Sequence, residues 1–205
     1  MRRIRRGCDR IAIGQAVHDA CNGDIVNRPG GGGIGVDGDA SEVRREAGAK
    51  SVPLALLKQN GHRAADLGLQ TSAAVNSLDT LTRANQNGRL WVAANADSVP
   101  VGFALVIELG LFAHLEELDV LPEHGRKGLG SALLEAVCEW AFTRGFSAVT
   151  LSTFRDVPWN APFYAQRGFS VVDSAEQPPE LVRIVEMERR KGLRTDLRVI
   201  MQREV

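Results

Sequence analysis

The sequence predicts a domain of the α/β (α+β) class that runs from about residue 42 to residue 205. Three observations support this. A strand pattern, a glycine turn and a helix pattern follow one another between residues 115 and 142. Two apolar runs at residues 90–94 and 101–109 flank a polar turn, as in a β-hairpin. Strand and helix patterns then alternate up to residue 203, which indicates a mixed architecture.

Composition and charge set the outer bounds. The 205 residues are 44% hydrophobic and 24% charged, as in an ordinary globular protein. Lys and Arg (25) balance Asp and Glu (25), so we expect no nucleic-acid or membrane partner. The three cysteines are widely spaced, which favours a reducing compartment without a metal site. The arginine-rich start is not followed by a long apolar run, and no 18-residue apolar stretch exists, so we expect a cytoplasmic protein.

Residues 1–41 differ from the rest because they end in a run of glycines that orders at a high entropic cost. We expect a flexible N-terminal extension before a domain at 42–205. Residues 33–38 (GIGVDG) match a dinucleotide-binding fingerprint by letter. A linker is the favoured interpretation, because no strand pattern precedes the match and no apolar helix pattern follows it.

The elements of the domain follow from apolar spacing and turn residues. Ser77 is expected to cap one helix and Asn160 another. Strands are expected at 41–47, 90–94, 101–109, 115–120, 146–154, 169–172 and 198–203, and helices at 52–67, 77–88, 129–142, 160–167 and 181–189.

The turn at residues 125–130 carries the first chemical signal. A glycine turn that opens a helix binds anions, because the first backbone N–H groups of the helix lack internal partners. Arg126 and Lys127 add positive charge beside those groups. The P-loop string is absent, and the turn does not match the dinucleotide fingerprint. The turn therefore predicts a phosphate site of another kind.

This turn resembles the pyrophosphate loop of the GNAT acetyltransferases, Q/R-x-x-G-x-G/A, with Gly125 at the first position as a departure from the pattern. A second family signature, a Tyr followed by Gly-Phe, is matched by Tyr164 and by Gly168 with Phe169. The resemblance covers about residues 42–205. It implies the GNAT acyl-CoA N-acyltransferase fold, with a central mixed, mostly antiparallel sheet flanked by helices. It also implies acetyl-CoA as co-substrate, no metal, and cofactor contacts from Leu118, Val120, Gly125, Arg126, Lys127, Gly128, Leu129, Gly130 and Ser131.

Acyl transfer to an amine needs a base, because an amine of pKa near 10 is neutral in only about one molecule in a thousand at pH 7. Glu116 and Glu117 lie on the strand that leads into the turn and are the candidate catalytic carboxylates. Strand alternation sends them to opposite faces, so we expect one to face the cleft. The resemblance favours Glu116. Solvated strand charges are the alternative for either residue.

Tyr164 is the third catalytic candidate, because the resemblance places the general acid for the departing sulfur there. The alternative is an amphipathic core tyrosine. A backbone N–H within residues 118–120 would polarise the carbonyl. Arg155 and Asp156 are weaker candidates, which either orient a substrate or pair with each other.

The resulting expectation is an N-acetyltransferase that moves the acetyl group of acetyl-CoA to a primary amine by direct attack in a ternary complex. The acceptor is a small molecule or a peptide, and the sequence does not choose between small amines, amino acids, antibiotics and protein N-termini. The alternative is a non-catalytic sensor or interaction module that binds acyl-CoA. A homodimer is left open.

Overall fold

The structure is a computed structural model that describes residues 42–45 and 76–205. The expected N-terminal extension at 1–41 and the expected helix at 52–67 lie outside the described residues.

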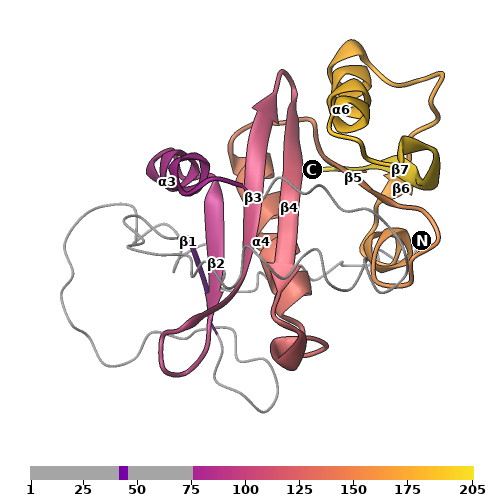
Figure 1. The fold of residues 1–205 in the computed structure, drawn as a ribbon. Helices are drawn as coiled ribbons and strands as arrows, with labels where there is room; N and C mark the ends of the chain where they lie inside the picture. Colours follow the sequence, from indigo (N-terminus) through magenta and orange to yellow (C-terminus); the bar gives the residue numbers. More distant parts are fainter. Residues whose placement is uncertain (1–41, 46–75) are drawn as a thin grey trace, which may run out of the picture.

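One sheet of seven strands forms the centre of the described part, in the order β1-β2-β3-β4-β5-β7-β6 (Figure 1). Strands β4 and β5 run parallel, and every other neighbouring pair runs antiparallel. The sheet is therefore mixed and mostly antiparallel, as expected. The strands are β1 (Glu42–Arg45), β2 (Leu90–Ala94), β3 (Pro100–Leu109), β4 (Phe112–Val120), β5 (Ala148–Phe154), β6 (Ser170–Val171) and β7 (Arg198–Glu204).

Helices cover both faces of this sheet. The alternation of side chains along β3 shows the two layers: Ala104 and Val106 pack in the cluster under α4, whereas Phe103 and Leu105 pack against α3. Helix α5 shares the α4 face, and α6 covers the opposite face over Ile200 of β7. The helices are α3 (Leu78–Gln86), α4 (Leu129–Thr143), α5 (Ala161–Ala165) and α6 (Pro179–Arg190), with short 3-10 turns at Pro122–His124 and Thr195–Leu197.

Local signals explain some of the helix and strand ends, and strand pairing explains others. Ser77 caps α3 as expected, with its side chain accepting a hydrogen bond of 3.1 Å from the Thr80 N–H. Asn160 occupies the N-cap position of α5, but its side chain makes no capping hydrogen bond, so that part of the expectation is wrong. Strand β4 begins at Phe112, earlier than its alternation indicates, because it pairs there with both β3 and β5. None of the described helices is both long and apolar enough to cross a membrane.

Candidate active site

Strands β4 and β5 diverge in the middle of the sheet. Their last paired residues are Leu115 and Leu151. Beyond that point β4 continues beside β3 to Val120, and β5 continues beside β7 to Phe154. The two strands thus form an open V whose inner edges lack a ladder partner among the described residues.

The inner edge of β4 presents backbone donors to this V. The Leu121 N–H donates to the Val101 carbonyl at 2.8 Å, which fixes the phase of the antiparallel β3–β4 ladder. Residues of such a ladder alternate between pointing toward the partner strand and pointing away from it. The N–H groups of Leu118 and Val120 therefore point away from β3 and into the V, where an acyl oxygen can accept from them.

The glycine turn follows β4 directly and leads into α4. Arg126 and Gly128 adopt positive φ angles of 60° and 83°, and Gly128 is the N-cap residue of α4. The first helical bond runs from the Ala132 N–H to the Gly128 carbonyl, so the N–H groups of residues 129–131 have no partner within the helix and can bind a ligand. A Cβ on Gly130 would lie 3.6 Å from the Phe163 ring and 4.0 Å from the Val120 side chain. The turn, the V and α5 therefore meet at one point.

Arg167 joins α5 to this turn, and it is not among the site residues predicted from the sequence. Its Nε and Nη2 atoms donate to the Ser131 hydroxyl at 2.9 and 2.6 Å, and its Nη1 donates to the Phe163 carbonyl at 2.7 Å. The guanidinium also stacks on the Phe163 ring, with Arg167 Cζ 3.7 Å from the ring centroid. A third positive charge therefore lies at the N-terminus of α4. The sequence shows that Arg167 lies inside the Tyr…Gly-Phe signature, but it does not show that the Arg167 side chain points toward the N-terminus of α4.

A β-bulge overturns the expectation that Glu116 and Glu117 point to opposite faces. Leu105 of β3 pairs with Glu117, and the next residue, Val106, pairs with Leu115, so Glu116 is the extra residue. Glu117 shares the face of Leu105, which packs against α3. Glu116 contacts α6 on that same side, with its Oε1 atom 3.8 Å from Lys191 Nζ. Both carboxylates therefore lie on the face opposite α4.

The two carboxylates differ in their surroundings. Burial raises the pKa of Glu116 above its ordinary value, with Lys191 opposing this shift and Glu188 and Glu117 adding to it. Glu117 accepts a hydrogen bond of 2.6 Å from the Asn76 side-chain amide. Glu116 is thus a carboxylate with a raised pKa at the mouth of the V, and Glu117 is tied to the segment before α3.

Tyr164 lies on the other side of the sheet, in the cluster under α4 and α5. It is 8% exposed and makes edge-on ring contacts with Phe163 and Phe169. Burial raises the pKa of Tyr164 above its ordinary value, and the cations Arg198 and Arg167 oppose this only in part. Because its pKa is raised, the Tyr164 phenol can donate a hydrogen bond but is a weak acid.

Buried polar groups line the α6 face beside the V. His114 is 2% exposed, and its Nδ1 lies 2.9 Å from the Thr150 hydroxyl. Burial and then Arg198 lower the pKa of His114 to about 4, so the ring is neutral at pH 7.

On the opposite face, burial raises the pKa of the Cys138 thiol to about 11, which leaves it a packing residue without nucleophilic character.

The Acetyltransferase (GNAT) family model matches residues 64–169, just over half of the chain. The chain belongs to the GNAT acetyltransferase family. That membership confirms the expected family and the expected class of acyltransferase enzyme. It also accounts for the two signatures, because the match contains both the glycine turn and the Tyr…Gly-Phe segment.

Solved structures agree with the GNAT fold. The PaiA N-acetyltransferase of Thermoplasma acidophilum, solved with coenzyme A, is 18% identical with a TM-score of 0.58, over 81% of this chain and 99% of that one. The ribosomal-protein-S18-alanine N-acetyltransferase of Escherichia coli is 20% identical with a TM-score of 0.54, over 80% and 94%. The N-acetylglutamate synthase of Neisseria gonorrhoeae, solved with coenzyme A and N-acetyl-glutamate, is 19% identical with a TM-score of 0.60, over 80% of this chain. The chain spans 35% of the length of that synthase, about a third.

Proposed function

We propose that this GNAT chain transfers the acetyl group of acetyl-CoA to a primary amine by direct attack within a ternary complex. The observation that carries the proposal is the open V. Its inner edge supplies the Leu118 and Val120 N–H donors, and it leads straight into the glycine turn that opens α4. One continuous segment thus offers donors for an acyl oxygen and, next to them, donors for a pyrophosphate.

The glycine turn would hold the cofactor through the backbone of residues 125–131. Gly128 adopts a positive φ at the N-cap of α4, whose first N–H groups lack partners within the helix, and Arg126, Lys127 and Arg167 add positive charge near them. An anion at a helix N-terminus is also stabilised by the helix dipole. Ser131 contributes by holding Arg167 in place.

Glu116 would take the proton of the acceptor amine. Its raised pKa makes it a stronger base than an exposed carboxylate, and it lies at the mouth of the V on the side away from α4. As the nitrogen–carbon bond forms and the carbon–sulfur bond breaks, Tyr164 would donate a hydrogen bond to the departing sulfur from the α4 side. Glu117, held by Asn76, would shape the acceptor side without taking a proton.

An assay of thiol release from acetyl-CoA over a panel of amines, together with calorimetry of acetyl-CoA binding, tests this proposal. Turnover of at least one amine and saturable binding are expected. Tight binding without any turnover would instead favour the non-catalytic acyl-CoA sensor. A cytoplasmic location, the absence of a metal, and a homodimer remain predictions from the sequence.

Gly128→Asp tests the turn itself, because it places a negative charge and a side chain where the pyrophosphate would lie. Acetyl-CoA binding should fall sharply while circular dichroism stays unchanged. Gly145→Asp is the matched control, because Gly145 ends the same helix with a similar φ of 78° and has no neighbour within 4 Å of an added Cβ. Equal losses of affinity in the two variants would overturn the assignment of the turn.

A further inference from the structure

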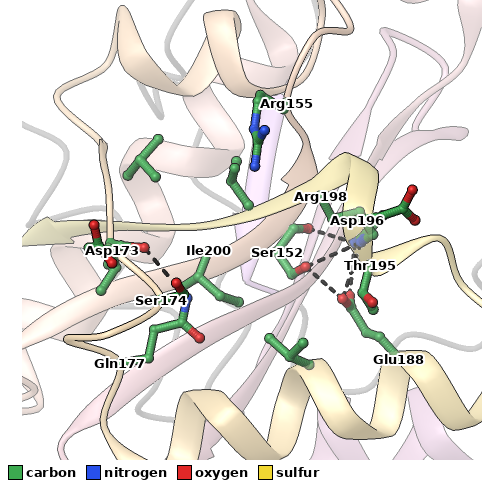
Figure 2. A pocket seen from close by; sticks show the side chains of 14 residues that line it. Ser152, Arg155, Asp173, Ser174, Gln177, Glu188, Thr195, Asp196, Arg198 and Ile200 are labelled. Carbon is green, nitrogen blue, oxygen red and sulfur yellow. Dashed lines mark hydrogen bonds and ion pairs between the residues drawn. The ribbon is translucent and has the colours of Figure 1, made fainter.

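A cavity of about 400 Å³ lies beside the V, on the α6 face of the sheet (Figure 2). Its volume is in the range of small-ligand sites. Ser152 and Arg198 line it where β5 ends and β7 begins, and Asp173, Ser174 and Gln177 of the segment after β6 form the opposite side. Val185 and Glu188 of α6 form the wall that faces the sheet.

Ser152 places this cavity next to the candidate base. Leu115 and Leu151 are the last paired residues of β4 and β5, so Glu116 and Ser152 are the next residues on either side of the V. Ser152 donates to Glu188 at 2.8 Å, which shows that its side chain lies on the α6 face. Glu116 lies on the same face, because it contacts Lys191 at the end of α6.

Arg198 is held rigidly at the wall of the cavity. Its Nε and Nη2 atoms donate to Glu188 at 3.1 and 2.8 Å, and its Nη2 also donates to the Ser152 carbonyl at 2.9 Å. The guanidinium also lies over the Phe154 ring at 5.0 Å. Only 14% of the side chain is exposed. Its Nη1 donates to no described residue, so two N–H donors of a fixed guanidinium remain for a ligand.

Arg155 adds a second guanidinium to the same cavity. It follows β5, and its backbone is fixed by a hydrogen bond of 2.9 Å from its N–H to the Leu197 carbonyl. The sequence left open whether Arg155 pairs with Asp156, and in the described part of the chain the two side chains form no ion pair. Arg155 therefore keeps its full charge toward a ligand.

Among the described residues, none of the acids that line the cavity forms an ion pair with Arg155. Glu188 is paired with Arg198, and Asp196 is paired with Arg194 at 2.6 Å. Asp173 lies on the far side, where it accepts a bond from the Ala175 N–H. Arg198 and Arg155 thus supply two guanidinium groups to the cavity wall, and Arg198 contacts Ser152, which lies across the V from Glu116. A guanidinium binds a carboxylate more strongly than it binds a neutral oxygen.

Resting on the proposed acetyltransferase function, we propose that the acceptor is a small amino acid whose carboxylate binds Arg198 and Arg155 while its amine faces Glu116. Glu116 and Ser152 lie directly across the V, and Arg198 contacts Ser152. The amine and the carboxylate of the acceptor must therefore be separated by only a few bonds. In the transfer, the acceptor nitrogen replaces sulfur on the acetyl carbon, its proton passes to Glu116, and the thiolate takes up a proton as coenzyme A leaves.

Matched ligand triplets test this inference: free amino acids, their primary amides, and the amines that lack the carboxylate altogether. Calorimetry with CoA-loaded protein measures their binding without turnover, and thiol release from acetyl-CoA measures transfer. Binding and transfer should be confined to the free acids. Arg155→Gln should raise the Kd and KM of the acids by about 10-fold or more, because a hydrogen bond to a charged group is lost, with little change for the amides.

Arg198 has to be replaced together with Glu188, because the loss of Arg198 alone would leave the Glu188 carboxylate buried without its ion-pair partner. The double variant Arg198→Gln with Glu188→Gln keeps a neutral pair, and it should weaken the binding of the acids at least as much as Arg155→Gln does. Arg190→Gln is the control, because Arg190 pairs with Glu186 on the exposed side of α6. It should leave acid binding unchanged.

The outcomes separate this inference from the proposed function. Equal binding and transfer of acids, amides and plain amines would overturn the carboxylate site and leave the acetyltransferase function standing. Carboxylate-dependent binding that Arg155→Gln abolishes, without transfer to any amine, would support the site and overturn the function. No binding of any amino acid to CoA-loaded protein would overturn the inference.

Discussion

Lys191 Nζ lies 3.8 Å from Glu116 Oε1, so the residue that caps the C-terminus of α6 lies directly over the bulge of β4. Burial is the larger influence on Glu116 and raises its pKa, and the Lys191 ammonium opposes that shift. The helix between β6 and β7 therefore tunes the carboxylate that is proposed to accept the amine proton.

Replacing Lys191 should move the pH dependence of catalysis. Glu116 acts as a base only when ionised, so the rate rises as pH passes upward through its pKa. In Lys191→Gln the opposing ammonium is gone, the pKa of Glu116 rises further, and the acidic limb of the kcat/KM profile should shift to higher pH. Arg190→Gln, which removes a neighbouring exposed cation, should leave the limb in place. An unmoved limb in Lys191→Gln would show that Glu116 is not the titrating base.

The two neighbouring carboxylates should respond differently to the same change. Glu116→Gln removes the base and should lower kcat by about 10²-fold, with the acidic limb of the profile lost. Glu117→Gln should be nearly silent, because a Gln carbonyl oxygen can still accept the hydrogen bond from Asn76. Steady-state kinetics over a range of pH measure both. Reversed effects would assign the base to Glu117.

Tyr164→Phe tests the hydroxyl without disturbing the packing of the ring. The hydroxyl would act only as charge develops on sulfur, so kcat should fall by about 10²-fold while the Kd of acetyl-CoA barely moves. The raised pKa of Tyr164 argues for a donated hydrogen bond without complete proton transfer, so the loss should be similar across the pH range. Wild-type turnover in this variant would make Tyr164 a structural residue.

Arg167 should contribute to cofactor affinity. Arg167→Gln removes a positive charge beside the first turn of α4 and frees the Ser131 hydroxyl. We expect the Kd of acetyl-CoA, measured by calorimetry, to rise about 10-fold, and the difference to shrink at high salt. Arg167→Lys should recover part of the affinity because it restores the charge. Arg183→Gln, an exposed position on α6, is the control. If Arg167→Gln binds like the wild type, the residue serves packing alone.

His114 should make stability depend on pH. Its folded-state pKa of about 4 lies below the ordinary value of 6.5, so the unfolded chain binds more protons between those values. The free energy of unfolding is therefore highest above pH 6.5 and falls as pH drops toward 4, by about 3 kcal/mol from this group. Denaturant titrations should show this loss in the wild type and not in His114→Gln, which keeps a polar partner for Thr150. Parallel pH curves for the two proteins would contradict the assignment.

Local signals in the sequence were enough for the elements and for the turn. The apolar spacing of residues 129–142 predicted α4, and Ser77 predicted the start of α3. These features depend on residues close together in the chain, where steric limits on φ and ψ and the open N–H groups of a helix act. For the same reason the turn could be proposed as a phosphate site before any fold was known.

The arrangement of side chains around the V was decided by tertiary structure. Strand alternation predicted opposite faces for Glu116 and Glu117, but the register between β3 and β4 inserts one extra residue and turns both to the same face. Register depends on how two strands pair. The alternation of apolar residues within one strand therefore does not reveal a bulge. The contact of Arg198 with Ser152 and that of Arg167 with Ser131 span 46 and 36 residues. Such pairs form only when the sheet brings distant segments together. Local sequence patterns therefore do not indicate which residues will meet.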